Sequence, residues 1–428
     1  MKSQERFDTF IDRLCVAVGH ADRAGPLQAY CTGLLLPGDR KSVEPMAARV
    51  EPGNVRSMHQ SMHHFVAEAP WEDARVIQVA REYVLPKLLR PGDDRGWIVD
   101  DTGIPKKGKH SVGVARQYCG QLGKQENCQV AVSLSVANAR GSLPIAYQLY
   151  LPQEWAEDKA RRETARVPDE VTFLTKPQIA LQQIRAAVEA GVPQGTVLAD
   201  AAYGNSGPFR DGVTALGLLY CVGLQSTTSV SPVERRFARS MRDGARARGD
   251  VRLGTVPDRA SVSVKALALS LPVSRFRTIY WREGTKGRLR SRFARVRVST
   301  GGGEAPAMAP RSVEWLLIEW PAGEAEPTKY WLSTLPRETS LRKLVRTAKL
   351  RWRIERDYLE LKDEIGLGHY EGRGWRGFHH HASLCIVAYA FLMGERLFSP
   401  SGQTRTRPSL HAPPLPAGFR PRGSPDPA

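Results

Sequence analysis

The order of strand-like and helix-like segments between residues 96 and 224 limits the fold more than any other feature of this sequence. Strand-like segments are short apolar or alternating runs, and helix-like segments have apolar residues three and four positions apart. A meander of three strands followed by helix, strand, helix and strand predicts a mixed sheet with the first strand inside it, an α/β fold. The segments are, in chain order, strands 96–101, 128–138 and 142–150, a helix 176–191, a strand 196–204, a helix 207–217 and a strand 219–224.

The remaining sequence predicts further regions around this core. Residues 1–92 have helical periodicity broken by prolines, and such a region could read DNA as a helix-turn-helix-like unit or serve as a packing or dimerisation cap. Residues 93–224 form the first part of the core, 225–337 read as a β-rich insertion, and 338–398 supply the second part of the core. The Pro-, Ser- and Gly-rich residues 399–428 are expected to be a disordered tail.

Composition points to the class of partner. The chain has 62 Lys and Arg against 44 Asp and Glu, a formal net charge of +18. This excess predicts a polyanionic partner, nucleic acid before an anionic membrane. Six scattered cysteines without a CxxC pair match neither a zinc site nor a disulfide framework and favour the cytoplasm. The charged N-terminus is unlike a signal peptide, and the longest apolar run, 382–393, is too short to span a bilayer.

Carboxylates follow two of the predicted strands. Asp101, preceded by Asp100, ends the first strand, and Asp200 ends the strand of 196–204. In such a sheet these two strands can be neighbours, and their paired carboxylates would then repel each other unless a divalent cation lay between them. Oxygen ligands select a hard ion, Mg²⁺ or Mn²⁺. Strand alternation puts Asp101 and Asp100 on opposite faces, so only one of them can face such an ion, and alternation does not say which.

A third acid lies in a segment predicted to be one long helix, 340–366. On it Arg351, Glu355 and Lys362 share one stripe, so that a carboxylate lies between two cations. An ordinary solvated face with salt bridges has the same pattern, and spacing alone leaves both interpretations open. The expected packing stripe beside it consists of Leu350, Ile354, Tyr358, Leu361 and Ile365.

Three segments in this order, "DDTG", "LADAAYG" and "RWRIERDYLELK", resemble the DDE transposases of bacterial insertion sequences, most of all the insertion-sequence-701 family, a relative of the insertion-sequence-4 group. The blocks 40–50 and 116–138 also look like that family, and the resemblance covers roughly residues 5–397. It implies an RNase H-like catalytic core interrupted by a β-rich insertion. It also implies a bacterial, nucleoid-associated protein that cuts and joins double-stranded DNA at the terminal inverted repeats of its element, with a dimer in the synaptic complex.

The resemblance assigns roles to particular residues. It implies that Asp101, Asp200 and Glu355 are the catalytic triad and hold Mg²⁺, two ions, for which Mn²⁺ can substitute. It makes Arg351 and Lys362 phosphate contacts. Where the family motif has a Tyr, three residues before Arg351, this sequence has Ala348, so a hairpin-forming excision does not follow from the resemblance.

Two further interpretations stay open. A domesticated or inactive copy would bind DNA without catalysis, and an unrelated metal-dependent phosphohydrolase would act on small phosphoesters without needing the excess of positive charge. Lys106 and Lys107, with Lys109, follow Asp101 on a Gly-containing loop. They either contact DNA phosphates or belong to a plain solvated loop.

Overall fold

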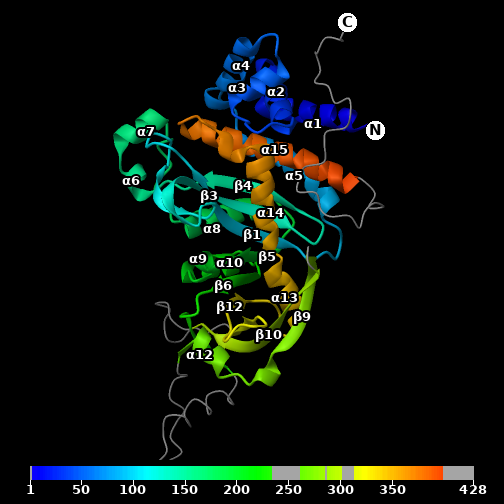
Figure 1. Cartoon of the computed structure of the whole chain (residues 1–428), viewed down its shortest axis with the longest axis vertical. Helices are drawn as coiled ribbons and strands as arrows, with labels where there is room; N and C mark the ends of the chain where they lie inside the picture. Colours follow the sequence, from blue (N-terminus) through cyan, green and yellow to red (C-terminus); the bar gives the residue numbers. More distant parts are fainter. Residues whose placement is uncertain (1, 234–260, 285–286, 301–312, 399–428) are drawn as a thin grey trace, which may run out of the picture. The chain divides into compact units, whose positions relative to one another are not determined.

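The computed structural model describes residues 2–233, 261–284, 287–300 and 313–398, which form two compact units (Figure 1). The first unit comprises Met1–Arg95, Asp100–Ala187 and Trp352–Ala428, and the second comprises Gly96–Val99 and Val188–Arg351. The expected disordered tail lies outside the described residues, as do 234–260 and 301–312 of the expected insertion.

Helices at both ends of the described chain share one core in the first unit. The rings of Phe7, Phe10 and Tyr83 pack on Phe391, with ring centroids 5.0, 6.0 and 6.3 Å from it. Helices α1, α2, α4 and α5 therefore pack on the C-terminal helix α15, and they belong to the same compact unit as Asp101. These helices are α1 (Ser3–Val18), η1 (Ala21–Arg23), α2 (Ala24–Leu35), α3 (Val43–Val50), α4 (Val55–Ala67), α5 (Asp73–Leu88) and α15 (Trp375–Phe398).

Helix α15 is long and apolar enough to cross a membrane by length and composition, and it is the one such helix among the described residues. Its most apolar window is 78% buried inside the protein. It contacts α5, α2, α4 and strand β4. Most of its apolar side chains are thus covered by protein, although the helix is longer than the apolar run 382–393 that the sequence showed.

The strands of the first unit form an antiparallel arrangement around β3. Strand β3 pairs with β2 at one end and with β4 along 131–137, and β1 (Gly96–Pro105) also lies beside β3. Helix α8 packs with Ile179 and Ile184 buried, and its Gln183 amide donates to the Val132 carbonyl at 3.0 Å. The other elements are β2 (Ala115–Cys119), β3 (Lys124–Ala137), β4 (Ser142–Leu149), α6 (Gln153–Ala156), α7 (Lys159–Ala165) and α8 (Lys176–Glu189).

The second unit is built on a mixed sheet in the order β1-β5-β6-β12-β11-β10-β7-β8, with β9 on β10. Strands β1, β5 and β6 are parallel, and the pairs from β6 through β12 and β11 to β10 are antiparallel. The elements are β5 (Thr196–Ala199), α9 (Ala201–Gly204), α10 (Gly207–Ala215), β6 (Tyr220–Leu224), β7 (Ser229–Pro232), β8 (Val262–Ser263), α12 (Val264–Leu269), η2 (Val273–Arg275), β9 (Arg277–Gly284), β10 (Gly287–Ser299), β11 (Val313–Trp320), β12 (Lys329–Ser333) and α13 (Leu341–Lys349). The α/β class and the mixed sheet are as predicted, and strands β9 to β12 lie within the stretch 225–337 that the sequence indicated to be β-rich.

The prediction of one long helix over 340–366 was wrong. The segment consists of α13, a turn at 350–351, α14 (Trp352–Leu359) and a π-helical turn, η3 (Glu360–Ile365), followed by η4 (Leu367–His369). At the break the Leu350 amide donates to the Thr347 carbonyl at 3.1 Å, a tighter turn than the α-helical bond to residue 346. The expected packing stripe survives, with Ile354, Leu361 and Ile365 buried.

Candidate functional site

The first predicted acid, Asp101, is paired with a lysine that the sequence did not single out. Its Oδ2 lies 2.7 Å from the Nζ of Lys176, the first residue of α8. The two side chains are 22% and 31% exposed. The Asp101 carboxylate is thus partly accessible to solvent and already has a cation beside it.

The second predicted acid, Asp200, caps a short helix in the second unit. It follows β5 directly, and its Oδ1 accepts a hydrogen bond of 2.9 Å from the Ala202 amide at the start of α9. Two glycines permit this tight turn from strand to helix. A Cβ on Gly204 would lie 1.9 Å from the Gly223 carbonyl oxygen, and a Cβ on Gly223 would lie 2.9 Å from the Ala201 nitrogen.

The strands that position these two acids are paired in parallel. Gly96, Trp97 and Ile98 of β1 lie in register with Thr196, Val197 and Leu198 of β5. The sequence allowed these strands to be neighbours, and the structure pairs them; the first strand does not end at Asp101, as the sequence suggested, but continues to Pro105. Asp101 and Asp200 each follow the paired stretch in the same chain direction.

The third predicted acid, Glu355, is exposed in the first turn of α14. Two side chains of α14 on either side of Glu355 in the sequence hold this helix in place. The Arg353 guanidinium donates to the Ala139 carbonyl, and the buried Asp357 accepts hydrogen bonds from Ser142 Oγ at 2.5 Å and Tyr389 OH at 3.0 Å. Glu355 therefore projects from a helix whose opposite side is bound to β4 and α15.

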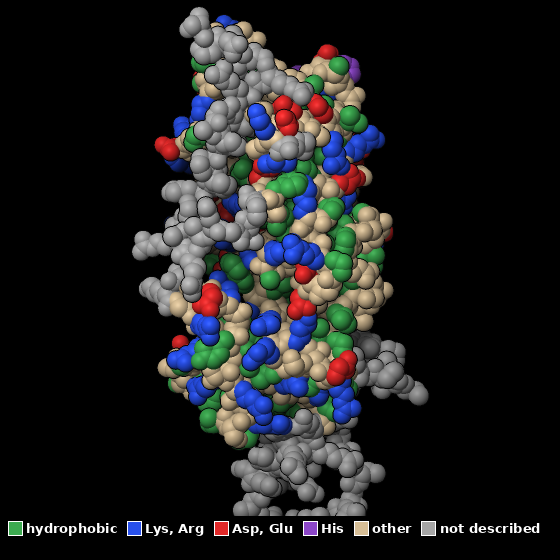
Figure 2. Space-filling model, turned by 90° about the vertical axis from the view of Figure 1, so that its right-hand side faces the viewer, with side chains coloured by type: hydrophobic (Ala, Val, Ile, Leu, Met, Phe, Trp, Pro, Cys, Tyr) green, Lys and Arg blue, Asp and Glu red, His purple; other side chains and the backbone are tan. Residues whose placement is uncertain are grey.

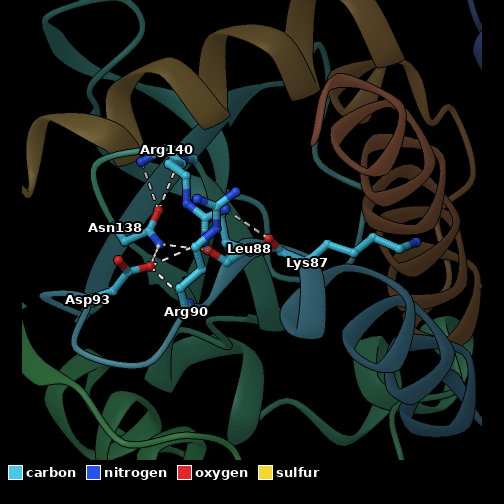
Figure 3. A network of polar contacts seen from close by, with 7 residues as sticks. Lys87, Leu88, Arg90, Asp93, Asn138 and Arg140 are labelled. Atoms are coloured by element: carbon cyan, nitrogen blue, oxygen red, sulfur yellow. Dashed lines mark hydrogen bonds and ion pairs between the residues drawn. The ribbon is translucent and has the colours of Figure 1, made fainter. Parts of the chain in front are cut away.

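A polar network binds the turn 138–141 to the end of α5 and to the loop that precedes β1 (Figure 3). The Asn138 amide donates to the Leu88 carbonyl at 2.8 Å and to Asp93 Oδ2 at 3.0 Å. Arg140 also binds Asp93, at 3.2 Å, and donates to the Lys87 and Leu88 carbonyls in the last turn of α5. A cation at a helix C-terminus is favourable, so this network both caps α5 and holds the turn that leads into β1.

The predicted DNA-contacting cations differ in their surroundings. Lys107 is exposed, whereas Lys106 donates to the Tyr370 carbonyl at 2.6 Å, and burial lowers its pKa to about 8. Lys362 donates to the Gly103 carbonyl at 2.8 Å, two residues beyond Asp101 on β1, and burial lowers its pKa. Arg351 is half-buried in the turn before α14. The Lys362 ammonium thus lies against the strand that carries Asp101.

The donor chemistry suits a hard divalent ion, since the three predicted ligands are carboxylates. In the part of the chain that the structure describes, no three His, Cys, Asp or Glu side chains are grouped closely enough to hold a metal ion. The accessible carboxylate of Asp101, which binds an ammonium, fits a cation position. The assembly of all three ligands remains a prediction.

The sequence interpretation missed Lys176 and Asp357. Lys176 follows "TFLT" at the start of a helix, and Asp357 is one of many charged residues between 351 and 364. The partners of both lie at least 32 positions away in the chain. No local pattern could have identified them.

Comparisons with known proteins show which family the chain belongs to. The family model of the DDE superfamily endonucleases matches residues 13–288, which include Asp101 and Asp200 but not Glu355. A protein of Microchaete diplosiphon, described as "Probable transposase for insertion sequence element IS701", is 33% identical over 180 residues. The aligned stretch covers 41% of this chain and 43% of that protein, so the chain matches less than half of the relative's length. Because the family model covers more than half of the sequence, this chain belongs to the DDE superfamily of endonucleases.

Proposed function

We propose that this chain is the transposase of an insertion sequence, which cuts double-stranded DNA at the element's terminal inverted repeats and joins the ends to a target. The observation that carries the proposal is the parallel pairing of β1, which contains Asp101, with β5, which Asp200 follows directly, in a DDE superfamily member. The similarity to a probable insertion-sequence transposase and the net charge of +18 support a DNA substrate.

In this proposal Asp101, Asp200 and Glu355 hold divalent metal, Mg²⁺ with Mn²⁺ as a substitute, and two ions in all. Bound metal would activate the attacking oxygen and stabilise the leaving 3′-oxygen. The chain's own task is to place carboxylates and cations around one phosphodiester. Lys362, braced against the Gly103 carbonyl, and Arg351 supply positive charge for phosphate oxygens, and exposed Lys107 contacts the strand further along. Lys106 would first have to release the Tyr370 carbonyl.

The test uses single variants of the three acids on a duplex that carries the inverted repeats flanking the gene. Asp101→Asn, Asp200→Asn and Glu355→Gln are each expected to reduce metal-dependent strand cleavage by at least about 10³-fold, because each removes a charged ligand. Binding of the same duplex should change little, since phosphate contacts come from cations. Gel analysis of cleavage and fluorescence anisotropy of binding measure the two quantities separately.

Three other acids provide matched controls. Asp100→Asn changes the acid beside Asp101, and Asp211→Asn and Asp363→Asn change exposed acids on α10 and η3. All three should cleave at close to the wild-type rate. Wild-type cleavage by Asp200→Asn would refute the triad, and loss of cleavage in Asp100→Asn alone would move the first ligand to Asp100.

The alternative is a transposase-derived protein that binds DNA without cutting it, which the net charge of +18 would serve equally well. Specific binding of the inverted repeats by the wild-type protein, with no cleavage in Mg²⁺ or Mn²⁺, would establish this alternative.

A further inference from the structure

The ion pair between Lys176 and Asp101 is not needed to hold the start of α8. Lys176 is the first residue of α8, where a positive charge opposes the helix dipole. The start of α8 is already fixed without it, because Gln178 Oε1 accepts hydrogen bonds from the Thr175 amide at 2.8 Å and the Thr175 hydroxyl at 2.9 Å. Buried side chains further along hold α8 on the sheet. The charge of Lys176 therefore destabilises its own helix, and the contact with Asp101 offsets this destabilisation.

The surroundings of the ammonium favour this contact. Lys176 Nζ lies 5.9 Å from the centre of the Tyr150 ring, which packs on the buried cluster of Cys119, Cys128 and Val130. An apolar wall on one side removes part of the water around the ammonium and strengthens its attraction to the carboxylate. The pair is nevertheless partly exposed, so solvent and small ions reach it.

We propose that Lys176 is a positioning residue that occupies the cation position at Asp101 until a divalent metal displaces it. This inference rests on the proposed function, in which Asp101 is a metal ligand. A Mg²⁺ ion binds carboxylate oxygen at about 2.0–2.1 Å and tolerates little distortion of its ligand shell. It cannot share Asp101 Oδ2 with an ammonium 2.7 Å away without strong like-charge repulsion.

Lysine suits such an exchange better than arginine. Its ammonium is a point charge on a flexible four-carbon stem, so it can swing away while the backbone of α8 stays in place. A guanidinium would hold the carboxylate through two parallel hydrogen bonds and compete more strongly. In the metal-free protein the lysine keeps the Asp101 carboxylate compensated, and metal binding has to overcome that pairing.

The experiment measures Mn²⁺ binding directly on the full-length protein without DNA, by electron paramagnetic resonance of free Mn²⁺ and by isothermal titration calorimetry. Lys176→Met keeps the length of the side chain and removes its charge. It is expected to lower the Mn²⁺ dissociation constant by about three- to tenfold, the size expected for loss of a partly exposed ion pair. Lys176→Arg is expected to leave the dissociation constant unchanged or raise it.

Thermal unfolding gives a second readout that does not depend on activity. Lys176→Met should unfold at a lower temperature than wild type in EDTA and gain more from a fixed Mn²⁺ concentration, because tighter binding to the folded state stabilises it more. Lys124→Met is the matched control. It removes a lysine of the same unit from an exposed pair with Glu126, at 3.1 Å, and should bind Mn²⁺ as wild type does.

Each outcome decides between supporting and overturning the proposal. Tighter binding in Lys176→Met alone supports it. Unchanged or weaker binding in Lys176→Met, or equal tightening in Lys176→Arg, overturns it while leaving the proposed function intact. If wild-type protein binds no Mn²⁺ and Asp101→Asn behaves identically, both this inference and the metal-dependent part of the proposed function fail. Lys176→Gln serves as the neutral variant if Lys176→Met does not fold.

Discussion

At the scale of single residues, Asp357 is the most strongly perturbed acid near the candidate site. Its side chain is 1% exposed, and its Oδ2 is buried without a hydrogen-bond partner among the described residues. Burial raises its pKa to about 7, against the lowering effect of the Ser142 and Tyr389 hydroxyls. Since Asp357 anchors the helix that carries Glu355, its protonation state bears on the stability of that helix.

Asp357 should make the protein less stable as the pH rises from about 4 to about 7. In this window the folded state holds a proton on Asp357 that the unfolded chain, with the ordinary pKa of 3.8, has released. The stabilisation is therefore complete below the window and lost above it. At about 1.4 kcal/mol per pKa unit the change reaches roughly 4 kcal/mol at most. Urea unfolding at pH 5 and pH 8 measures it.

Asp357→Asn imitates the protonated side chain and should lose this part of the pH dependence. Its carboxamide oxygen can still accept from Ser142 and Tyr389, so we expect the variant to be more stable than wild type at pH 8. Asp363→Asn, an exposed acid on the next turn, is the control. An equal pH dependence in wild type and Asp357→Asn would contradict this explanation.

At the scale of elements, the close contact of α9 with β6 places Asp200. Neither Gly204 nor Gly223 has room for a Cβ, because the backbone of the other element lies within 3.0 Å of its position. The strand-to-helix turn that Asp200 caps thus depends on the close approach of α9 to β6, which is possible only because both contact positions are glycines.

Gly223→Ala is therefore expected to push the Asp200 turn away from β6. The strain should lower the free energy of unfolding by about 1–3 kcal/mol and reduce DNA cleavage more than DNA binding. Gly207→Ala at the start of α10 is the matched control, since its Cβ would meet nothing within 4 Å. Cleavage by Gly223→Ala at the rate of the control would show that the position of Asp200 does not depend on this contact.

At the scale of the whole molecule, Lys and Arg outnumber Asp and Glu by 62 to 44. On the face shown in Figure 2, Lys and Arg side chains are spread widely and Asp and Glu are fewer. In the second unit the β9–β10 pair presents exposed Arg277, Arg282, Arg288 and Arg290. An excess of this kind attracts a phosphate backbone without reading its sequence.

DNA affinity should accordingly fall steeply with salt. If the protein contacts six or more phosphates, raising the salt from 50 to 200 mM should weaken binding about 10³-fold or more through counterion release. The Asp101→Asn variant should show the same slope, because it removes no phosphate contact. A nearly salt-independent affinity, measured by anisotropy from 50 to 200 mM KCl, would count against phosphate contacts as the main source of binding.

Much of the sheet could be predicted from local patterns. The apolar runs at 96–99 and 196–199 identified β1 and β5, and their order in the chain allowed them to be neighbours. The break at 350–351 could not be predicted in this way. Periodicity continues through it in the buried residues Ile354 and Ile365, so the pattern resembles that of an uninterrupted helix.

The sequence by itself determined the α/β class, the strands that carry Asp101 and Asp200, and the excess of positive charge. These features depend on periodicity and composition, which can be read from residues that are close together in the sequence. Only the tertiary structure decided that Lys176 pairs with Asp101, that Asp357 is buried beneath Tyr389, and that the N-terminal helices share a core with α15. Each of these depends on burial and charge compensation between distant segments, for which neither partner carries a local signal.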